Sequence, residues 1–292
     1  MPDGLWLDAV VRLRAARAPA VLVTVASVRG HAPRRAGAKM VVSTTGAWGS
    51  IGGGNVEALA IERAHAQLAN PPAEPELMTC ELSERAPSEH GAQCCGGKVT
   101  VLLEPLRPVP AVAIFGTGHV GLELARILAR HDIELHLVDT RLDMLSESRL
   151  AVLAGAVATV HVHRVPLLPE SVFGELPSGT HVLIMTHDHA EDVALCDAAL
   201  RRDDLGSIGL IGSSGKWARF RRRLADEGGH DPQTIARIRT PIGLPDISGK
   251  EPATIAVSVA ADLLRTFERE AEAERETKPE DELDPEGSGV RS

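Results

Sequence analysis

The sequence has very few aromatic residues, with 4 Phe, 3 Trp and no Tyr among 292 residues. Proteins that bind single-stranded nucleic acids stack the bases on aromatic rings, and this chain offers few rings for that purpose. The chain also lacks a run of about 18 apolar residues, the length that a membrane-spanning helix needs. We therefore expect a protein that binds neither nucleic acid nor a membrane, with a core of Ala, Val, Leu and Ile.

Cysteines are also few, and they are irregularly spaced at positions 80, 94, 95 and 196. Such spacing is not typical of a disulfide framework and favours the reducing cytoplasm. Cys80 and Cys196 are expected to be small buried hydrophobic residues. Cys94 and Cys95 precede two glycines that leave them accessible, so either thiolate is a candidate metal ligand or sulfur carrier. Zinc sites normally use cysteines two to four residues apart with a second such pair, and neither condition holds for the adjacent Cys94 and Cys95.

The net charge of −9 is concentrated at the end of the chain, because residues 268–292 carry 10 acidic and 4 basic side chains. A segment so charged and so poor in apolar residues is expected to be disordered. The rest of the chain has a net charge of only −3. It therefore shows no global basic field of the kind that binds nucleic-acid phosphates.

Three prolines between positions 104 and 110 interrupt helix and strand formation and predict a domain boundary. We predict a domain over residues 1–106, a second over 109–267 and the acidic tail over 268–292. The first should contain helices at 5–16 and 55–69 and strands at 20–28, 39–43 and 98–103. The second should alternate strands at 111–115, 134–138, 181–185 and 207–211 with helices at 120–130, 190–200 and 217–226, before a last helix at 252–268. The predicted fold class is α/β, with a C-terminal Rossmann-like parallel sheet, a smaller N-terminal α/β domain and a disordered acidic tail.

A glycine fingerprint, Gly116-Thr-Gly118-His119-Val-Gly121, follows the strand at 111–115 and opens a helix. Asp139 ends the next strand, 18 residues after Gly121. Such a turn lets backbone N–H groups bind a phosphate at the helix start, and the acidic residue would select a ribose over a 2′-phosphate, as in NAD. The same turn also serves as architecture alone in many folds.

Two further polar clusters follow predicted strands. His187, Asp188 and His189 could bind a metal or move protons; alternatively, Asp188 caps the following helix and forms a capping box with Glu191. Ser213, Ser214 and Lys216 could hold an anion at a helix start, or the serine could simply cap the helix.

In the first domain, three successive glycines, Gly52, Gly53 and Gly54, precede Asn55 and a helix. Their conformational cost favours close approach of a ligand to the backbone, although a tight turn is the alternative. A preceding glycine-rich connection also carries a cluster of cationic or titratable side chains: Arg29, His31, Arg34, Arg35 and Lys39.

Taken in order, these motifs resemble the XdhC/CoxI family of xanthine dehydrogenase accessory proteins. The resemblance covers most of residues 20–265, and its paired cysteines favour the XdhC branch. Asn55, where relatives often carry His or Cys, and Glu251, in place of a usual Thr, depart from the expected pattern. The motifs that carry the resemblance are VTVASVRGHAPRRAGAKM, GSIGGGNVE, QCCGGKVTVLLEP, IFGTGHVG with VDTR, MTHDHAEDVALC, IGLIGSSGKWARF and TPIGLPDISGKEPATIAVSVAADLL.

The resemblance implies a cytoplasmic chaperone of purine catabolism with no catalytic activity. It would bind molybdenum cofactor (molybdopterin), protect it during sulfuration and insert it into apo xanthine dehydrogenase. The implied partners are that enzyme, a cysteine desulfurase, the molybdenum cofactor nucleotidyltransferase and a second copy of the chain in a homodimer. Cys94 and Cys95 become candidates to contact molybdenum, the glycine turns candidates for phosphates, and Trp48 and Trp217 candidates to stack on the pterin.

Two other functions remain open from the residues alone. An NAD-dependent oxidoreductase would use Asp139 on the ribose and His187 or His189 as the acid/base group. A metal-dependent hydrolase would use the cluster at 187–189, but this cluster lacks the separated third ligand of a catalytic zinc site.

Overall fold

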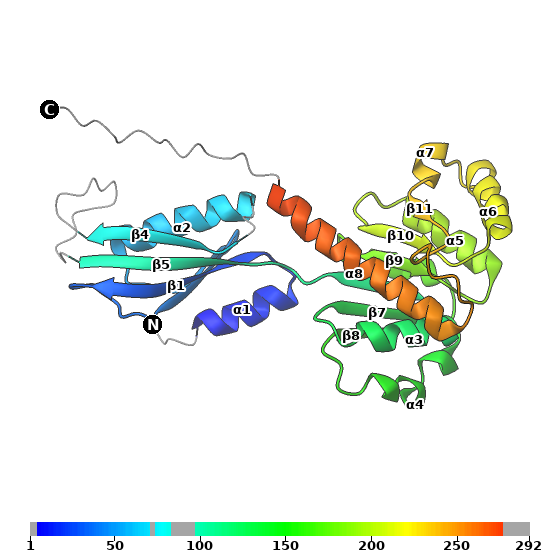
Figure 1. The fold of residues 1–292 in the computed structure, drawn as a ribbon, viewed down its shortest axis with the longest axis horizontal. Coiled ribbons are helices and arrows are strands. Elements are labelled where there is room, and N and C mark those ends of the chain that lie inside the picture. The colour runs from blue at the N-terminus through cyan, green and yellow to red at the C-terminus, as the bar shows by residue number, and fades with distance from the viewer. Residues whose placement is uncertain (1–4, 71–73, 83–96, 277–292) are drawn as a thin grey trace. The chain divides into compact units, whose positions relative to one another are not determined.

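The computed structural model describes residues 5–70, 74–82 and 97–276 and divides into two compact units (Figure 1). The first unit ends at Pro108 and also takes in the chain from Glu268, and the second is Val109–Phe267. No helix among the described residues is long and apolar enough to cross a membrane. Cys94 and Cys95 lie outside the described residues.

An antiparallel sheet forms the centre of the first unit, with its strands in the order β3-β2-β1-β5-β4. The long central pair joins β1 to β5 through a register that shifts between Val25 and Ser27. Two helices, α1 (Leu5–Ala15) and α2 (Gly54–Ala69), pack on this sheet. The strands are β1 (Ala20–Arg29), β2 (Lys39–Ser43), β3 (Gly46–Gly49), β4 (Glu76–Leu82) and β5 (Gly97–Leu106).

The two faces of this sheet are covered by different helices because side chains alternate along each strand. Val21, Val23 and Val25 of β1 pack with Val56 and Ala60 of α2 in the larger core. A smaller cluster on the other face contains Ala9 of α1 together with Ala20 and Val41.

A six-stranded parallel sheet forms the centre of the second unit, in the order β11-β10-β9-β6-β7-β8. The chain starts in the middle at β6, fills one side with β7 and β8, and then crosses to β9 and the other side. This is the strand order of doubly wound nucleotide-binding folds, in which ligands bind outside the carboxyl ends of the two strands where the order reverses. The strands are β6 (Ala111–Phe115), β7 (Glu134–Asp139), β8 (Thr159–Arg164), β9 (His181–Ile184), β10 (Ser207–Leu210) and β11 (Ile238–Arg239).

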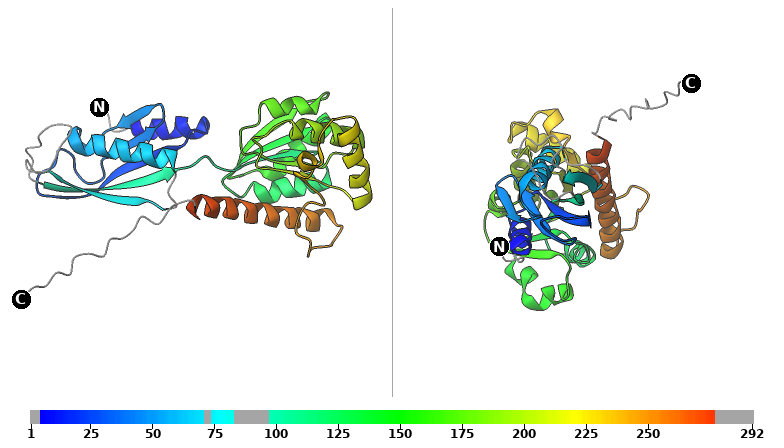
Figure 2. Two further views of the ribbon diagram at one scale, coloured as in Figure 1. Left: turned by 90° about the horizontal axis from the view of Figure 1, so that it is seen from above. Right: turned by 90° about the vertical axis from the view of Figure 1, so that its left-hand side faces the viewer.

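Helices cover both faces of the parallel sheet, and α8 runs along one side of the unit (Figure 2). One core joins the sheet to α3 and α8, and the other joins it to α5, α6 and the short helix η3. The α-helices are α3 (His119–Leu128), α4 (Glu147–Leu150), α5 (His189–Leu200), α6 (Ser214–Asp226), α7 (Pro232–Ile235) and α8 (Pro252–Glu276). The 3-10 helices are η1 (Leu142–Leu145), η2 (Ala151–Leu153) and η3 (Pro169–Gly174).

The predicted fold class is confirmed: a Rossmann-like parallel sheet follows a smaller N-terminal unit of mixed helix and sheet. The last helix, however, continues to Glu276 and does not end at 268, where the tail was expected to begin. Its final turns are rich in Ala, Glu and Arg, which have high helix propensity. Residues 277–292 of the predicted tail lie outside the described residues.

Candidate functional site

The candidate site of the second unit lies at the carboxyl ends of β6, β7, β9 and β10, where hydrogen bonds join the four connections. The Thr117 N–H donates to Asp139 Oδ2 at 2.7 Å and links the ends of β6 and β7. The Thr140 hydroxyl donates to Glu191 Oε2 at 3.0 Å and links the end of β7 to the start of α5. The Lys216 ammonium then donates to Asp192 Oδ2 at 2.5 Å and links α5 to α6.

The glycine fingerprint forms the turn between β6 and α3. Gly116 has a φ of +101°, and a Cβ there would lie 2.4 Å from the Met185 carbonyl oxygen. A Cβ on Gly121 would lie 2.1 Å from the Gly116 carbonyl oxygen, so this glycine permits close packing of helix against strand. Gly118, the N-cap of α3, faces open space. It is therefore the glycine of this turn that a ligand can approach.

Asp139 is buried and accepts hydrogen bonds from two neighbouring residues. Besides the Thr117 N–H, the Thr117 hydroxyl donates to Oδ2 at 3.1 Å, and the Arg141 N–H and Nε each donate to Oδ1 at 3.0 Å. Burial raises the pKa of Asp139, but the hydrogen bonds from Arg141 and Thr117 outweigh it and hold the pKa below the ordinary value. These contacts favour a role in positioning the glycine turn over one in accepting bonds from a ribose.

Lys216 is also engaged within the protein. Its ammonium pairs with Asp192, which is fully buried, and donates to the Ile211 carbonyl at 3.0 Å. Asp192 in turn accepts from the N–H and the hydroxyl of Thr186, at 3.1 and 2.8 Å. These contacts fix the strand-to-helix turns to one another, and removing Lys216 would leave the buried Asp192 charge without its ion-pair partner. The lysine is accordingly less available to an external anion.

The two turns that the sequence left ambiguous contain helix caps. Asp188 Oδ1 accepts from the N–H groups of Ala190 and Glu191, at 2.6 and 3.1 Å, which confirms the capping interpretation for α5. The reciprocal half of a capping box does not form, because the Asp188 N–H donates to Thr186 and the Glu191 carboxylate accepts from Thr140. Ser213 caps α6 by accepting from the Lys216 N–H at 3.3 Å, and Ser214 is exposed.

Histidines 119, 187 and 189 have exposed side chains at this edge. Among the residues that the structure describes, the cluster at 187–189 does not converge into a three-ligand metal site. Burial raises the pKa of Glu191, and the negative charges of Asp139 and Asp192 add to the effect. A carboxyl group with a raised pKa at the carboxyl ends of parallel strands is typical of functional sites.

The triple glycine of the first unit surrounds a carboxylate of the chain itself. Glu57 Oε2 accepts from the Ser50 hydroxyl at 2.6 Å and from the N–H groups of Ile51 and Gly53, each at 3.0 Å. Burial raises the pKa of Glu57, but these hydrogen bonds outweigh it and hold the pKa below the ordinary value. Positive φ angles at Gly52, Gly53 and Gly54 permit this wrapping. The turn therefore already holds an anion, and Asn55 lies half-buried at the start of α2.

A cationic cleft of about 480 Å³ lies beside that turn. Its lining includes Trp6, Arg34, Arg35 and Lys39, and none of the described residues that line it is acidic. The Lys39 ammonium donates to the Thr24 hydroxyl at 2.8 Å and lies 5.7 Å from the Trp6 ring centre. The sequence indicated the cationic connection but not Trp6, which comes from the distant helix α1.

Trp48 and Trp217, the predicted stacking residues, are partly buried in hydrophobic clusters. Trp48 also has the Arg12 guanidinium 5.8 Å from its ring centre. Cys196 is buried as predicted, and Cys80 is half-buried; burial raises the pKa of both thiols. Sequence reasoning gave no role to Thr117, Arg141 or Asp192, although all three stand within the quoted motifs and within one to three residues of a predicted site residue.

The fold and the site together define a Rossmann-type binding domain with an open helix start, joined to a smaller unit that carries a cationic cleft. The chain belongs to the XdhC and CoxI family: a family model described as the XdhC Rossmann domain matches residues 112–263, and one described as the XdhC and CoxI family matches residues 13–79.

Curated relatives carry the family names at low identity. The chain is 26% identical to the molybdenum cofactor insertion chaperone PaoD of Escherichia coli, over 84% of this chain and 82% of PaoD. It is 24% identical to YqeB of Escherichia coli, described as uncharacterized, over 87% of this chain but only 44% of YqeB. It is 28% identical to a protein of Bacillus subtilis described as a probable xanthine dehydrogenase subunit, over 59% of this chain and 47% of that protein. The chain thus spans less than half the length of two of these relatives.

A solved structure of a xanthine dehydrogenase from Bacillus halodurans is also similar, with 20% sequence identity and a TM-score of 0.45. The match covers 90% of this chain and 96% of that chain.

Proposed function

We propose that this protein binds molybdenum cofactor as cargo and inserts it into a xanthine dehydrogenase, acting as a chaperone with no turnover of its own. The observation that carries the proposal is the cationic cleft of the first unit. Molybdenum cofactor is a pterin with an anionic dithiolene and a phosphate. A cleft of about 480 Å³ lies within the usual range of ligand pockets.

The lining of the cleft matches that chemistry. Arg34, Arg35 and Lys39 supply positive charge for the dithiolene or phosphate, and arginine in particular binds phosphate through paired hydrogen bonds. Trp6 offers an aromatic face in a chain with only seven Phe and Trp side chains. The name of the relative PaoD, which matches over most of both chains, supports the same cargo.

The second unit offers a separate position for an anionic or nucleotide part of the cargo. The start of α3 has no side-chain cap, and Gly118 leaves space beside it. Helix starts of this kind attract phosphates. We assign His119 to the same position, with Gly116 and Gly121 shaping the turn that presents it. His187, Asp188, His189, Ser213 and Ser214 border the same edge of the sheet.

The remaining parts of the proposal concern the pathway. Cys94 and Cys95 are proposed to contact molybdenum or sulfur while a cysteine desulfurase supplies the sulfido ligand. The protein would receive the cofactor from the molybdenum cofactor nucleotidyltransferase, act as a homodimer in the cytoplasm and serve purine catabolism through its client enzyme.

Cofactor analysis of the purified protein tests the proposal. The protein is produced in a host that makes molybdenum cofactor, and molybdenum, pterin and nicotinamide nucleotide are measured per chain. We expect stoichiometric pterin and a rise in the activity of apo xanthine dehydrogenase when the loaded protein is added. Absence of pterin together with no activation would contradict the chaperone function, and bound NAD with turnover would favour an oxidoreductase.

A charge reversal locates the cargo. Arg35→Glu places a negative charge in the cleft, and we expect pterin affinity to fall at least about tenfold, which corresponds to about 1.4 kcal/mol. Arg221→Glu makes the same change on the exposed surface of α6 and should leave the affinity unchanged. Equal affinity in the two variants would remove the cleft from the site.

A further inference from the structure

Three histidines and one glutamate lie on one face of the strands β7 and β8, and a second glutamate, Glu175, lies beside them. This cluster is separate from the candidate site at the carboxyl ends of the strands. Glu134 and His136 alternate with apolar residues on β7, and His161 and His163 do so on the edge strand β8. The parallel register sets His136 directly opposite His161. Period-two alternation therefore puts all four side chains on the same face of the sheet.

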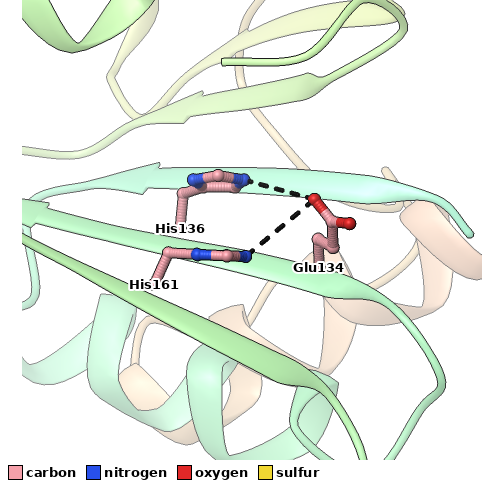
Figure 3. Close-up of side chains that lie close together, drawn as sticks. All are labelled: Glu134, His136 and His161. Atoms are coloured by element: carbon pink, nitrogen blue, oxygen red, sulfur yellow. Dashed lines mark ion pairs between the residues drawn. The ribbon is translucent and has the colours of Figure 1, made fainter. Parts of the chain in front are cut away.

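Three of these side chains point toward one another (Figure 3). The Nε2 atoms of His136 and His161 each lie 3.9 Å from Glu134 Oε2. These three ligand atoms all lie within 4.8 Å of one another. Among the residues that the structure describes, the buried Nε2 of His161 has no hydrogen-bond partner. The two nitrogen-to-oxygen distances of 3.9 Å are too long for hydrogen bonds, but they are close to the distances between ligand atoms that share a metal ion.

The exposure of the three side chains falls from the edge strand inward. His161 is 41% exposed, whereas Glu134 and His136 are 14% and 6% exposed. His161 on the edge strand is therefore the side chain that can turn to admit an ion to the buried nitrogen atoms, while the other two side chains are held by their surroundings. Ligand atoms about 2.1 Å from a tetrahedral ion lie about 3.4 Å apart. Modest tilting of the exposed His161 ring and the Glu134 carboxylate closes the difference.

A second pair of residues orients His136. His163 Nε2 lies 3.0 Å from His136 Nδ1, and the Glu175 carboxylate lies 3.4 Å from His163 Nδ1. If His163 Nδ1–H donates to Glu175, then His163 Nε2 accepts from His136 Nδ1–H. His136 Nε2 is left with its lone pair directed at the cluster. Metal-binding histidines are commonly held in this way, with the other ring nitrogen donating to a fixed acceptor.

We infer that Glu134, His136 and His161 bind a divalent transition-metal ion of the zinc class. Two imidazole nitrogens and one carboxylate oxygen form the ligand set of three-ligand zinc sites that keep a coordination position open for water. Magnesium and calcium prefer all-oxygen ligands and are not expected here. His163 and Glu175 act as positioning residues, and the ion would tie the edge strand β8 to β7.

Cobalt and zinc titrations of the metal-free, full-length protein test the inference. Co²⁺ reports its ligands by its absorption: nitrogen and oxygen ligands give weak visible bands, and thiolates add strong charge-transfer bands. We expect one Co²⁺ per chain with a nitrogen and oxygen spectrum, displaced by Zn²⁺. An ion held by Cys94 or Cys95 would show the thiolate bands and is thereby distinguished.

Single variants identify the ligands. His161→Ala and Glu134→Gln should each weaken binding at least about tenfold, and Glu175→Gln about tenfold through the orientation of His163 and His136. His65→Ala removes an exposed histidine of α2 and should change nothing. Both ligand variants alter side chains outside the deep core, so their folding can be checked by circular dichroism. Wild-type affinity and stoichiometry in both would overturn the inference.

Discussion

Charged side chains hold several turns of the protein, and two of them, Asp139 and Lys216, are residues that the sequence offers as ligands. Asp139 fixes Thr117 and Arg141, Lys216 pairs with the buried Asp192, and Glu57 closes the triple-glycine loop. Sequence reasoning located Asp139 and Lys216 at predicted turns because their spacing from strands and glycines is regular. It could not assign their partners, because Thr117 lies 22 residues from Asp139 and Asp192 lies 24 residues from Lys216, and only tertiary packing brings each pair into contact.

Two glutamates of the protein have pKa values shifted in opposite directions, and each shift predicts a pH dependence. For Glu57 the folded pKa is below its ordinary value of 4.5. Its stabilisation is therefore complete at higher pH and is lost as the pH falls through the folded pKa. For Glu191 the folded pKa is raised. The protonated form fits the fold better, so stability contributed by this group is lost as the pH rises through the folded pKa.

Glutamine substitutions at Glu57 and Glu191 test the direction of each pH dependence. At about pH 7, Glu57→Gln should lower the free energy of unfolding by about 1–2 kcal/mol, since hydrogen bonds to a charged acceptor are lost. The difference in the free energy of unfolding between Glu57→Gln and the wild-type protein should become smaller at acidic pH. Glu191→Gln should raise stability near neutral pH, with no gain in acid. Urea unfolding followed by tryptophan fluorescence gives the values, and Glu62→Gln on the exposed side of α2 is the control. A deficit of Glu57→Gln that grows in acid would contradict the assignment.

At the scale of elements, the strand-turn-helix units of the second unit follow from local sequence. The apolar run at 111–115 is fully buried, and the glycine fingerprint after it gives the predicted turn. The edge strand β8, with the sequence TVHVHR, was missed because its histidines made a short half-buried strand resemble a polar connection. Its alternation of Val with His was the available signal. Strands β3 and β4 are short or partly exposed, and only pairing with β2 and β5 defines them.

Two glycines of the fingerprint should differ in their tolerance of alanine. Gly121→Ala would force a Cβ to within 2.1 Å of the Gly116 carbonyl oxygen, so helix and strand must separate. We expect a loss of at least about 2 kcal/mol in the free energy of unfolding. Gly118 has a negative φ, and a Cβ added there would meet open space. Gly118→Ala should therefore change the free energy of unfolding by no more than about 1 kcal/mol. Chemical denaturation measures both variants, and equal losses would show that the packing explanation is wrong.

At the scale of the whole molecule, each compact unit contains its own hydrophobic core. The two clusters on either side of the parallel sheet draw their buried residues from positions 112–263, and the two clusters of the first unit draw theirs from positions 9–103. Helix α8 belongs to the parallel-sheet core through Ala256, Val259, Ala260 and Leu263. A unit with a complete core and its own covering helices is expected to fold without the rest of the chain.

A fragment of residues 109–276 tests this independence. It retains both cores of the parallel sheet and the whole of α8, so it should unfold cooperatively in urea. Amide hydrogen exchange of the buried strand β6 should be as slow in the fragment as in the full chain, because the hydrogen bonds of β6 to β7 and β9 are all within the fragment. Fluorescence of Trp217, which packs against one of these cores, reports the same transition. Rapid exchange of β6 in the fragment would mean that its stability depends on residues 1–108.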